Sequence, residues 1–180
     1  SEGEVLQLLN SHNPDISEEH YFKVIEFKTA QLFEACGSIA GLINNTDKKT
    51  IQAYAKIGHH FGLIFQIADD ILDYSGKPNE IGKNIGDDLS EGKVTLPLIY
   101  TIQKSNEKQK EMIKNSIKTG DISKLPDIIQ IMEDNNIVKT VKISAEKHII
   151  EIKKILDELG PHENNNVIVN LAEHSINRNY

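Results

Sequence analysis

Residues 65–73 read Phe65-Gln66-Ile67-Ala68-Asp69-Asp70-Ile71-Leu72-Asp73 and place three carboxylates in an otherwise apolar helical segment. On a helix, residues three and four apart are neighbours, so Asp69 and Asp70 both lie beside Asp73, and Gln66 lies a turn before Asp69. Like charges this close repel, and each carboxylate is costly to bury without a partner. The three aspartates therefore predict a bound cation, and Mg²⁺ takes carboxylate and phosphate oxygens as ligands.

A glycine-punctuated segment, residues 82–93, follows the aspartates and supplies Lys83 and Lys93. Lysine ammonium groups act as point charges on phosphate. Residues 62–67, just before the aspartates, are too apolar for a helix that is solvated on all sides. These two features favour a cavity that holds a diphosphate through Mg²⁺.

The acidic segment has two other interpretations. A solvated acidic helix face is the commonest origin of such a pattern. A calcium-binding EF-hand requires a glycine at loop position six and carboxylates at positions one and twelve. Placing Gly76 at position six puts Ile71 first and Gly82 twelfth, which excludes the EF-hand.

Apolar residues recur at spacings of three and four along the whole chain, and no segment of useful length alternates with period two. The pattern predicts an all-α fold and one domain over residues 1–180. Gly58 and Gly62 lie one turn apart and predict the close approach of a neighbouring helix. The first long helix is expected to start near residues 15–18 with a capping box. The expected helices cover about residues 5–9, 17–44, 47–73, 95 onward, 107–118, 123–134, 137–159 and 163–177.

Composition restricts the class of protein. The 180 residues are 38% hydrophobic and 26% charged, with a net charge of −7, so the basic footprint of a nucleic-acid-binding protein is missing. Cys36 is the sole cysteine, which excludes an internal disulfide and a cysteine-based metal site and favours a reducing, cytoplasmic compartment. The apolar run of residues 61–67 is interrupted by Gln66 and followed by Asp69, so it predicts no membrane span.

Lys28 and Thr29 interrupt the apolar stripe of the first long helix. A lysine and a hydroxyl at such a place are by default a surface pair whose lysine extends its charge to solvent. The alternative is that both side chains point into the cavity that the aspartates face and contact phosphate there.

Read together, these segments resemble the trans-isoprenyl diphosphate synthases, and most closely the long-chain polyprenyl branch that includes the octaprenyl diphosphate synthases. The resemblance rests on residues 1–8, 28–35, 65–73, 82–89 and 95–98. Residues 65–73 look like the second aspartate-rich motif of that family, and the other segments match its motifs in the same order.

The resemblance implies a helical bundle around a deep cavity, in which Mg²⁺ links two aspartate-rich motifs to an allylic diphosphate. It implies an alkyl transfer that adds isopentenyl diphosphate and makes long-chain all-trans polyprenyl diphosphates for isoprenoid or quinone side-chain synthesis. A homodimer, with peripheral membrane contact through the lipid product, is also implied. The residues carried over are Asp69, Asp70 and Asp73 for the metal, Lys28, Thr29, Gln66 and Lys83 for catalysis and the diphosphate, and Phe65 and Lys93 for substrate binding.

The chain also departs from the family pattern. It has no second D-D-x-x-D motif, and Asp87-Asp88 belongs to the loop without a third aspartate as partner. We therefore expect the C-terminal portion of a synthase, inactive alone, with an exposed apolar stripe that ends at Ile43. A non-catalytic helical subunit or scaffold of a heteromeric synthase, and an inactive fragment of a decayed gene, remain alternatives. Residues 83–97 fit chain elongation and disfavour a terpene-type cyclase.

Overall fold

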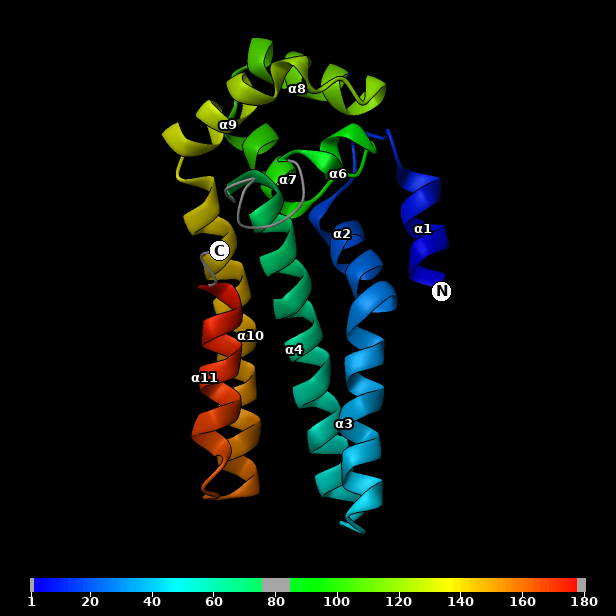
Figure 1. Cartoon of the computed structure of the whole chain (residues 1–180), viewed down its shortest axis with the longest axis vertical. Coiled ribbons are helices and arrows are strands. Elements are labelled where there is room, and N and C mark those ends of the chain that lie inside the picture. The colour runs from blue at the N-terminus through cyan, green and yellow to red at the C-terminus, as the bar shows by residue number, and fades with distance from the viewer. Residues whose placement is uncertain (1, 76–84, 178–180) are drawn as a thin grey trace.

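The computed structural model describes residues 2–75 and 85–177, and within these ranges the regular elements are all helices (Figure 1). The predicted all-α class is confirmed. In chain order the helices are α1 (Glu2–Asn10), α2 (Glu18–Ile25), the π-helix η1 (Glu26–Ala30), α3 (Gln31–Ile43), α4 (Lys48–Ser75), α6 (Asp87–Ser90), α7 (Leu96–Lys104), α8 (Glu107–Thr119), the 3₁₀-helix η2 (Ile122–Lys124), α9 (Leu125–Asp134), α10 (Ile137–Leu159) and α11 (Asn165–Ile176).

Helix α4 is the centre of the bundle. It packs against α3 on one side and against α10 and α11 on the other, and the four run along the long axis of the molecule (Figure 1). The short helices α6 to α9 lie beyond the C-terminal end of α4, and α1 lies beside η1. The acidic segment of α4 therefore lies where the long helices meet the short ones.

The predicted helix of residues 17–44 is three consecutive helical segments. Its cap is Ser17, whose Oγ accepts a hydrogen bond of 3.1 Å from the backbone N–H of His20. The predicted capping box is wrong, because the third helical residue is a histidine and not a glutamate. The π-helix η1 then interrupts the α-helical pattern at Glu26–Ala30. Single π turns inside α-helices are frequent at functional sites.

The predicted close approach at Gly58 and Gly62 is confirmed. A Cβ atom added at Gly58 would contact the carbonyl oxygen of Phe33, and one added at Gly62 would lie 2.6 Å from the Cα of Ala30. Both partners are backbone atoms of η1 and α3, which cannot move as a flexible side chain can. The glycines thus let α4 lie directly against the helix that carries Lys28 and Thr29.

Isoleucine and leucine side chains from α4, α7, α8, α9 and α10 form one continuous core.

The apolar stripe that ends at Ile43 is exposed, as expected: Ile43 is 72% solvent-exposed, and Leu9 of α1 is 76% solvent-exposed. Other large apolar side chains of α1 and α3 share this exposure: Val5, Leu8, Leu32, Ile39 and Leu42. Among the described residues, no helix combines the length and the hydropathy that crossing a membrane requires.

Candidate functional site

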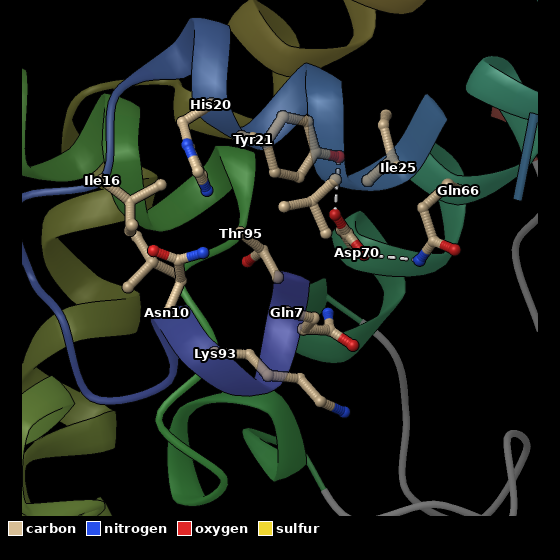
Figure 2. A pocket seen from close by; sticks show the side chains of 12 residues that line it. Gln7, Asn10, Ile16, His20, Tyr21, Ile25, Gln66, Asp70, Lys93 and Thr95 are labelled. Atoms are coloured by element: carbon tan, nitrogen blue, oxygen red, sulfur yellow. Dashed lines mark hydrogen bonds between the residues drawn. The ribbon is translucent and has the colours of Figure 1, made fainter. Parts of the chain in front are cut away.

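Asp70 is anchored inside the protein. Its side chain is 97% buried, since only 3% of the residue is exposed. The Tyr21 hydroxyl donates a 2.6 Å hydrogen bond to Oδ2, and Gln66 Nε2 donates a 2.9 Å hydrogen bond to Oδ1 (Figure 2). Gln66 lies one turn before Asp69 on α4, as the helical spacing predicts, and its hydrogen bond is to Asp70, four residues further on.

Asp73, one turn further along α4, is held by the segment that returns to this end of the helix. The backbone N–H of Asp88 donates a 3.2 Å hydrogen bond to Asp73 Oδ2, and the N–H of Gly86 donates a 2.9 Å bond to the carbonyl oxygen of Asp73. From the sequence we expected no role for Asp88 beside the three aspartates, and its hydrogen bond to Asp73 corrects this expectation. Asp88 belongs to the same acidic group.

Burial, followed by the charge of Asp88, raises the pKa of Asp70 to about 7, although the hydrogen bonds from Tyr21 and Gln66 act to lower it. Burial likewise raises the pKa of Asp73 to about 7, again with the charge of Asp88 as the next cause. Burial is therefore the main cause of both raised pKa values, and repulsion from the neighbouring carboxylate of Asp88 adds to it. A cation at this end of α4 would relieve the repulsion.

Mg²⁺ fits the donor chemistry of this site, which consists of carboxylate oxygens. Within residues 2–75 and 85–177, however, no group of three or more histidine, cysteine, aspartate or glutamate side chains already stands in position to hold a metal. Asp70 points toward Tyr21, and Asp73 accepts from the Asp88 backbone. Mg²⁺ usually takes only one or two carboxylates and completes its shell with water and substrate phosphates, so these residues suit an ion that arrives with a diphosphate.

Lys28 and Thr29 lie in η1, next to α4. The Thr29 hydroxyl donates a 2.9 Å hydrogen bond to Gln66 Oε1, and Lys28 Nζ donates a 3.0 Å bond to Gln7 Oε1. Both residues are half-buried. Gln66 thus joins Thr29 to Asp70. This connection favours the interpretation in which Lys28 and Thr29 face the acidic segment, and it disfavours the interpretation in which both are solvated surface residues.

Phe65 is 37% exposed, and its ring centroid lies 5.6 Å from that of Phe33. Phe33 also stacks on Phe61, with ring centroids 6.2 Å apart. Phe61, Phe65 and Asp69 follow one another at four-residue intervals, so they share a face of α4. An aromatic surface therefore leads along this face to a carboxylate.

Lys93 is engaged by acidic neighbours. Its Nζ lies 3.2 Å from Asp88 Oδ1 and also pairs with Glu91. Burial alone would lower the pKa of Lys93, but its bonds to Glu91 and Asp88 raise it, so the ammonium charge is retained. Lys83, the other lysine predicted to contact phosphate, lies outside the described residues.

A small pocket adjoins Asp70, with about 30 Å³ of space for water-sized groups. Figure 2 shows polar side chains from α1 and α2 around it, among them Gln7, Asn10 and His20. Sequence reasoning missed Tyr21 and Gln7. No local signal marks either of them, because each meets its partner across a helix interface.

Comparison with known proteins gives consistent matches. A family model described as "Polyprenyl synthetase" matches residues 1–134. The octaprenyl diphosphate synthase of Haemophilus influenzae is 34% identical over 181 residues, which cover 100% of this chain and 55% of that protein. The "Heptaprenyl diphosphate synthase component 2" of Geobacillus stearothermophilus is 28% identical over 178 residues, with 99% and 55% covered.

The fold is matched equally well by a solved structure. A polyprenyl synthase from Caulobacter crescentus, complexed with calcium and isoprenyl diphosphate, has a TM-score of 0.93 at 30% identity and covers 99% of this chain and 55% of that one. The chain spans about half the length of the relatives named here.

Proposed function

Because the chain belongs to the polyprenyl synthetase family, we propose that it carries the second aspartate-rich motif of a prenyltransferase. The proposed reaction joins isopentenyl diphosphate to an allylic diphosphate and makes a long-chain all-trans polyprenyl diphosphate. The observation that carries this proposal is the position of Asp69, Asp70 and Asp73 at the end of α4, next to Lys28 and Thr29 of η1.

The proposed ligands for Mg²⁺ are Asp69, Asp70 and Asp73, of which Asp70 is held by Tyr21 and Gln66. When bound, Mg²⁺ supplies positive charge that stabilises the diphosphate as it leaves the allylic carbon. Lys28, which extends from η1 to Gln7, is proposed to add a further positive charge for the diphosphate. Lys83 and Lys93 are proposed to do the same from the segment that follows α4, and Gln66 and Thr29 to orient the diphosphate by hydrogen bonds.

The aromatic face of α4 suits the hydrocarbon part of an allylic substrate. Phe65 is proposed to contact that chain, with Phe33 and Phe61 behind it. Since Asp69 follows Phe65 by one turn, the apolar tail and the charged head of one substrate would bind along a single helix face. Apolar side chains around the allylic carbon would also keep water away from developing positive charge.

The test is incorporation of labelled isopentenyl diphosphate into product, with farnesyl diphosphate and Mg²⁺. The chain is assayed alone and together with the upstream half of a related synthase supplied as a second polypeptide. We expect product only in the mixture, and a loss of at least 100-fold with Asp69→Ala. Asp157→Ala, which alters an exposed carboxylate on α10, is the matched control and should retain activity. A folded mixture that makes no product would refute the prenyltransferase proposal.

A second candidate function is a helical subunit of a heteromeric synthase. The exposed apolar side chains of α1 and α3 favour it, because apolar faces of this kind mark protein contacts. Loss of product in the mixture with Asp69→Ala would argue against a purely structural subunit. A cytoplasmic location, a homodimeric whole enzyme and peripheral membrane contact through the lipid product complete the proposal.

A further inference from the structure

Tyr21 is the buried partner of the acidic segment from another helix. It lies on α2, 49 residues before Asp70, and only 4% of it is exposed. Its hydroxyl lies 2.6 Å from Asp70 Oδ2, the short distance that is typical of a hydroxyl donating to a carboxylate (Figure 2). This bond connects α2 with the last turns of α4.

The second oxygen of Asp70 is held as well. Gln66 Nε2 donates to Oδ1 at 2.9 Å, and Gln66 Oε1 in turn accepts from the Thr29 hydroxyl at 2.9 Å. Tyr21, Asp70, Gln66 and Thr29 thus form an unbroken hydrogen-bond chain that runs from α2 through α4 to η1. Both carboxylate oxygens of Asp70 have a donor, so its side chain has one preferred orientation.

We propose that Tyr21 is a positioning residue of the acidic site, acting through Asp70 to fix the end of α4 in the orientation that binds a divalent cation. This inference rests on the proposed function. Asp70 lies between Asp69 and Asp73 on the same helix, so an anchor on Asp70 limits the rotation of α4 and sets the direction of both neighbours.

The chain offers a matched control for this bond. The Tyr100 hydroxyl on α7 donates a 2.8 Å hydrogen bond to Glu18 Oε1, again a tyrosine that joins a carboxylate on another helix. Tyr100→Phe removes the same kind of bond as Tyr21→Phe, but its carboxylate partner is Glu18 and not an aspartate of the acidic segment. A general loss of stability would affect both variants, whereas a positioning role would affect only the Tyr21 variant.

The experiment measures binding of Mn²⁺, as a paramagnetic probe of the Mg²⁺ site, to the full chain in the presence of inorganic pyrophosphate. Free Mn²⁺ is followed by electron paramagnetic resonance at a temperature where circular dichroism shows every variant folded. Loss of an outer hydrogen-bond partner of a metal ligand typically weakens metal binding 10- to 100-fold. We expect Tyr21→Phe to weaken Mn²⁺ binding about tenfold and Tyr100→Phe to leave it within twofold.

A double-mutant cycle shows whether Tyr21 acts through Asp70. If it does, Tyr21→Phe has no further effect on Mn²⁺ affinity in a chain that already carries Asp70→Asn. Asp70→Asn alone also decides the question if Tyr21→Phe does not fold, because it should weaken binding at least fivefold. Unchanged affinity in either single variant overturns the positioning role while the proposed function stands. A wild-type chain that binds no Mn²⁺ overturns both.

Discussion

Acidification should weaken the contact between α4 and α10 at a pair of histidines. Nδ1 of His148 on α10 lies 3.1 Å from Nδ1 of His60 on α4, and the two ring centroids are 5.3 Å apart. One proton between the two nitrogens satisfies both rings, whereas protonation of both rings would bring two positive charges together. Burial, followed by the charge of His60, lowers the pKa of His148 to about 4, and burial also lowers the pKa of His60.

The direction of the effect follows from proton binding. Between the ordinary histidine pKa of 6.5 and the folded value of about 4, the unfolded chain binds more protons at His148 than the folded chain does. The contribution to the free energy of unfolding is therefore complete above pH 6.5 and is lost as the pH falls toward 4. At about 1.36 kcal/mol per pKa unit, this amounts to roughly 3 kcal/mol, and partial exposure of the ring reduces it to about 1–2 kcal/mol.

The assay is urea unfolding at pH 7.5, 6.0 and 5.0, for the wild-type chain, His148→Gln and the control His174→Gln, which alters an exposed histidine of α11. We expect the wild type and His174→Gln to lose about 1–2 kcal/mol more than His148→Gln on acidification. The raised pKa values of Asp70 and Asp73 act in the opposite direction in this pH range, but they act in all three proteins and cancel in the difference. Parallel pH profiles for His148→Gln and the wild type would refute the reasoning.

Two further changes test the packing of the long helices. Gly58→Val should lower the free energy of unfolding by about 2–3 kcal/mol, because its side chain meets the Phe33 backbone; an unchanged urea midpoint would contradict the close approach. Leu9→Gln combined with Ile43→Gln should reduce self-association of the isolated chain in sedimentation velocity, because both side chains are mostly exposed. If the wild-type chain already sediments as a monomer, the exposed apolar surface does not drive association.

Helix positions could be predicted from the sequence wherever periodicity and end signals agree. Residues 137–159 form α10 with the predicted bounds, and α8 ends where Gly120 takes a positive φ of 68°. The π-helix η1 could not be predicted in this way, because one wider turn leaves the spacing of apolar residues almost unchanged. The structure alone reveals that Lys28 and Thr29 lie in an irregular turn.

The acidic residues themselves could be predicted, but their partners could not. The four-residue spacing holds equally for Gln66 with Asp70 and for Asp69 with Asp73, and only the direction of α2 decides which pair faces inward. Asp88 is separated from Asp73 by a glycine-punctuated segment, so its approach depends on how the chain returns to the end of α4. Helical spacing describes the surface of one helix and carries no information about which face a second helix covers.

Three helices of this chain contribute hydrogen bonds to the acidic site. Tyr21 comes from α2, Gln66 from α4 and Asp88 from α6, so the orientation of Asp70 and Asp73 is set by contacts among these three helices. The apolar side chains of α1 and α3 are different, because much of their surface is exposed in the described structure. We therefore expect that cation binding by the acidic site can be tested in this chain, and that the proposed reaction needs a partner surface over the exposed side chains of α1 and α3. Cation binding and turnover are for this reason separable properties, and the Mn²⁺ and product assays measure one each.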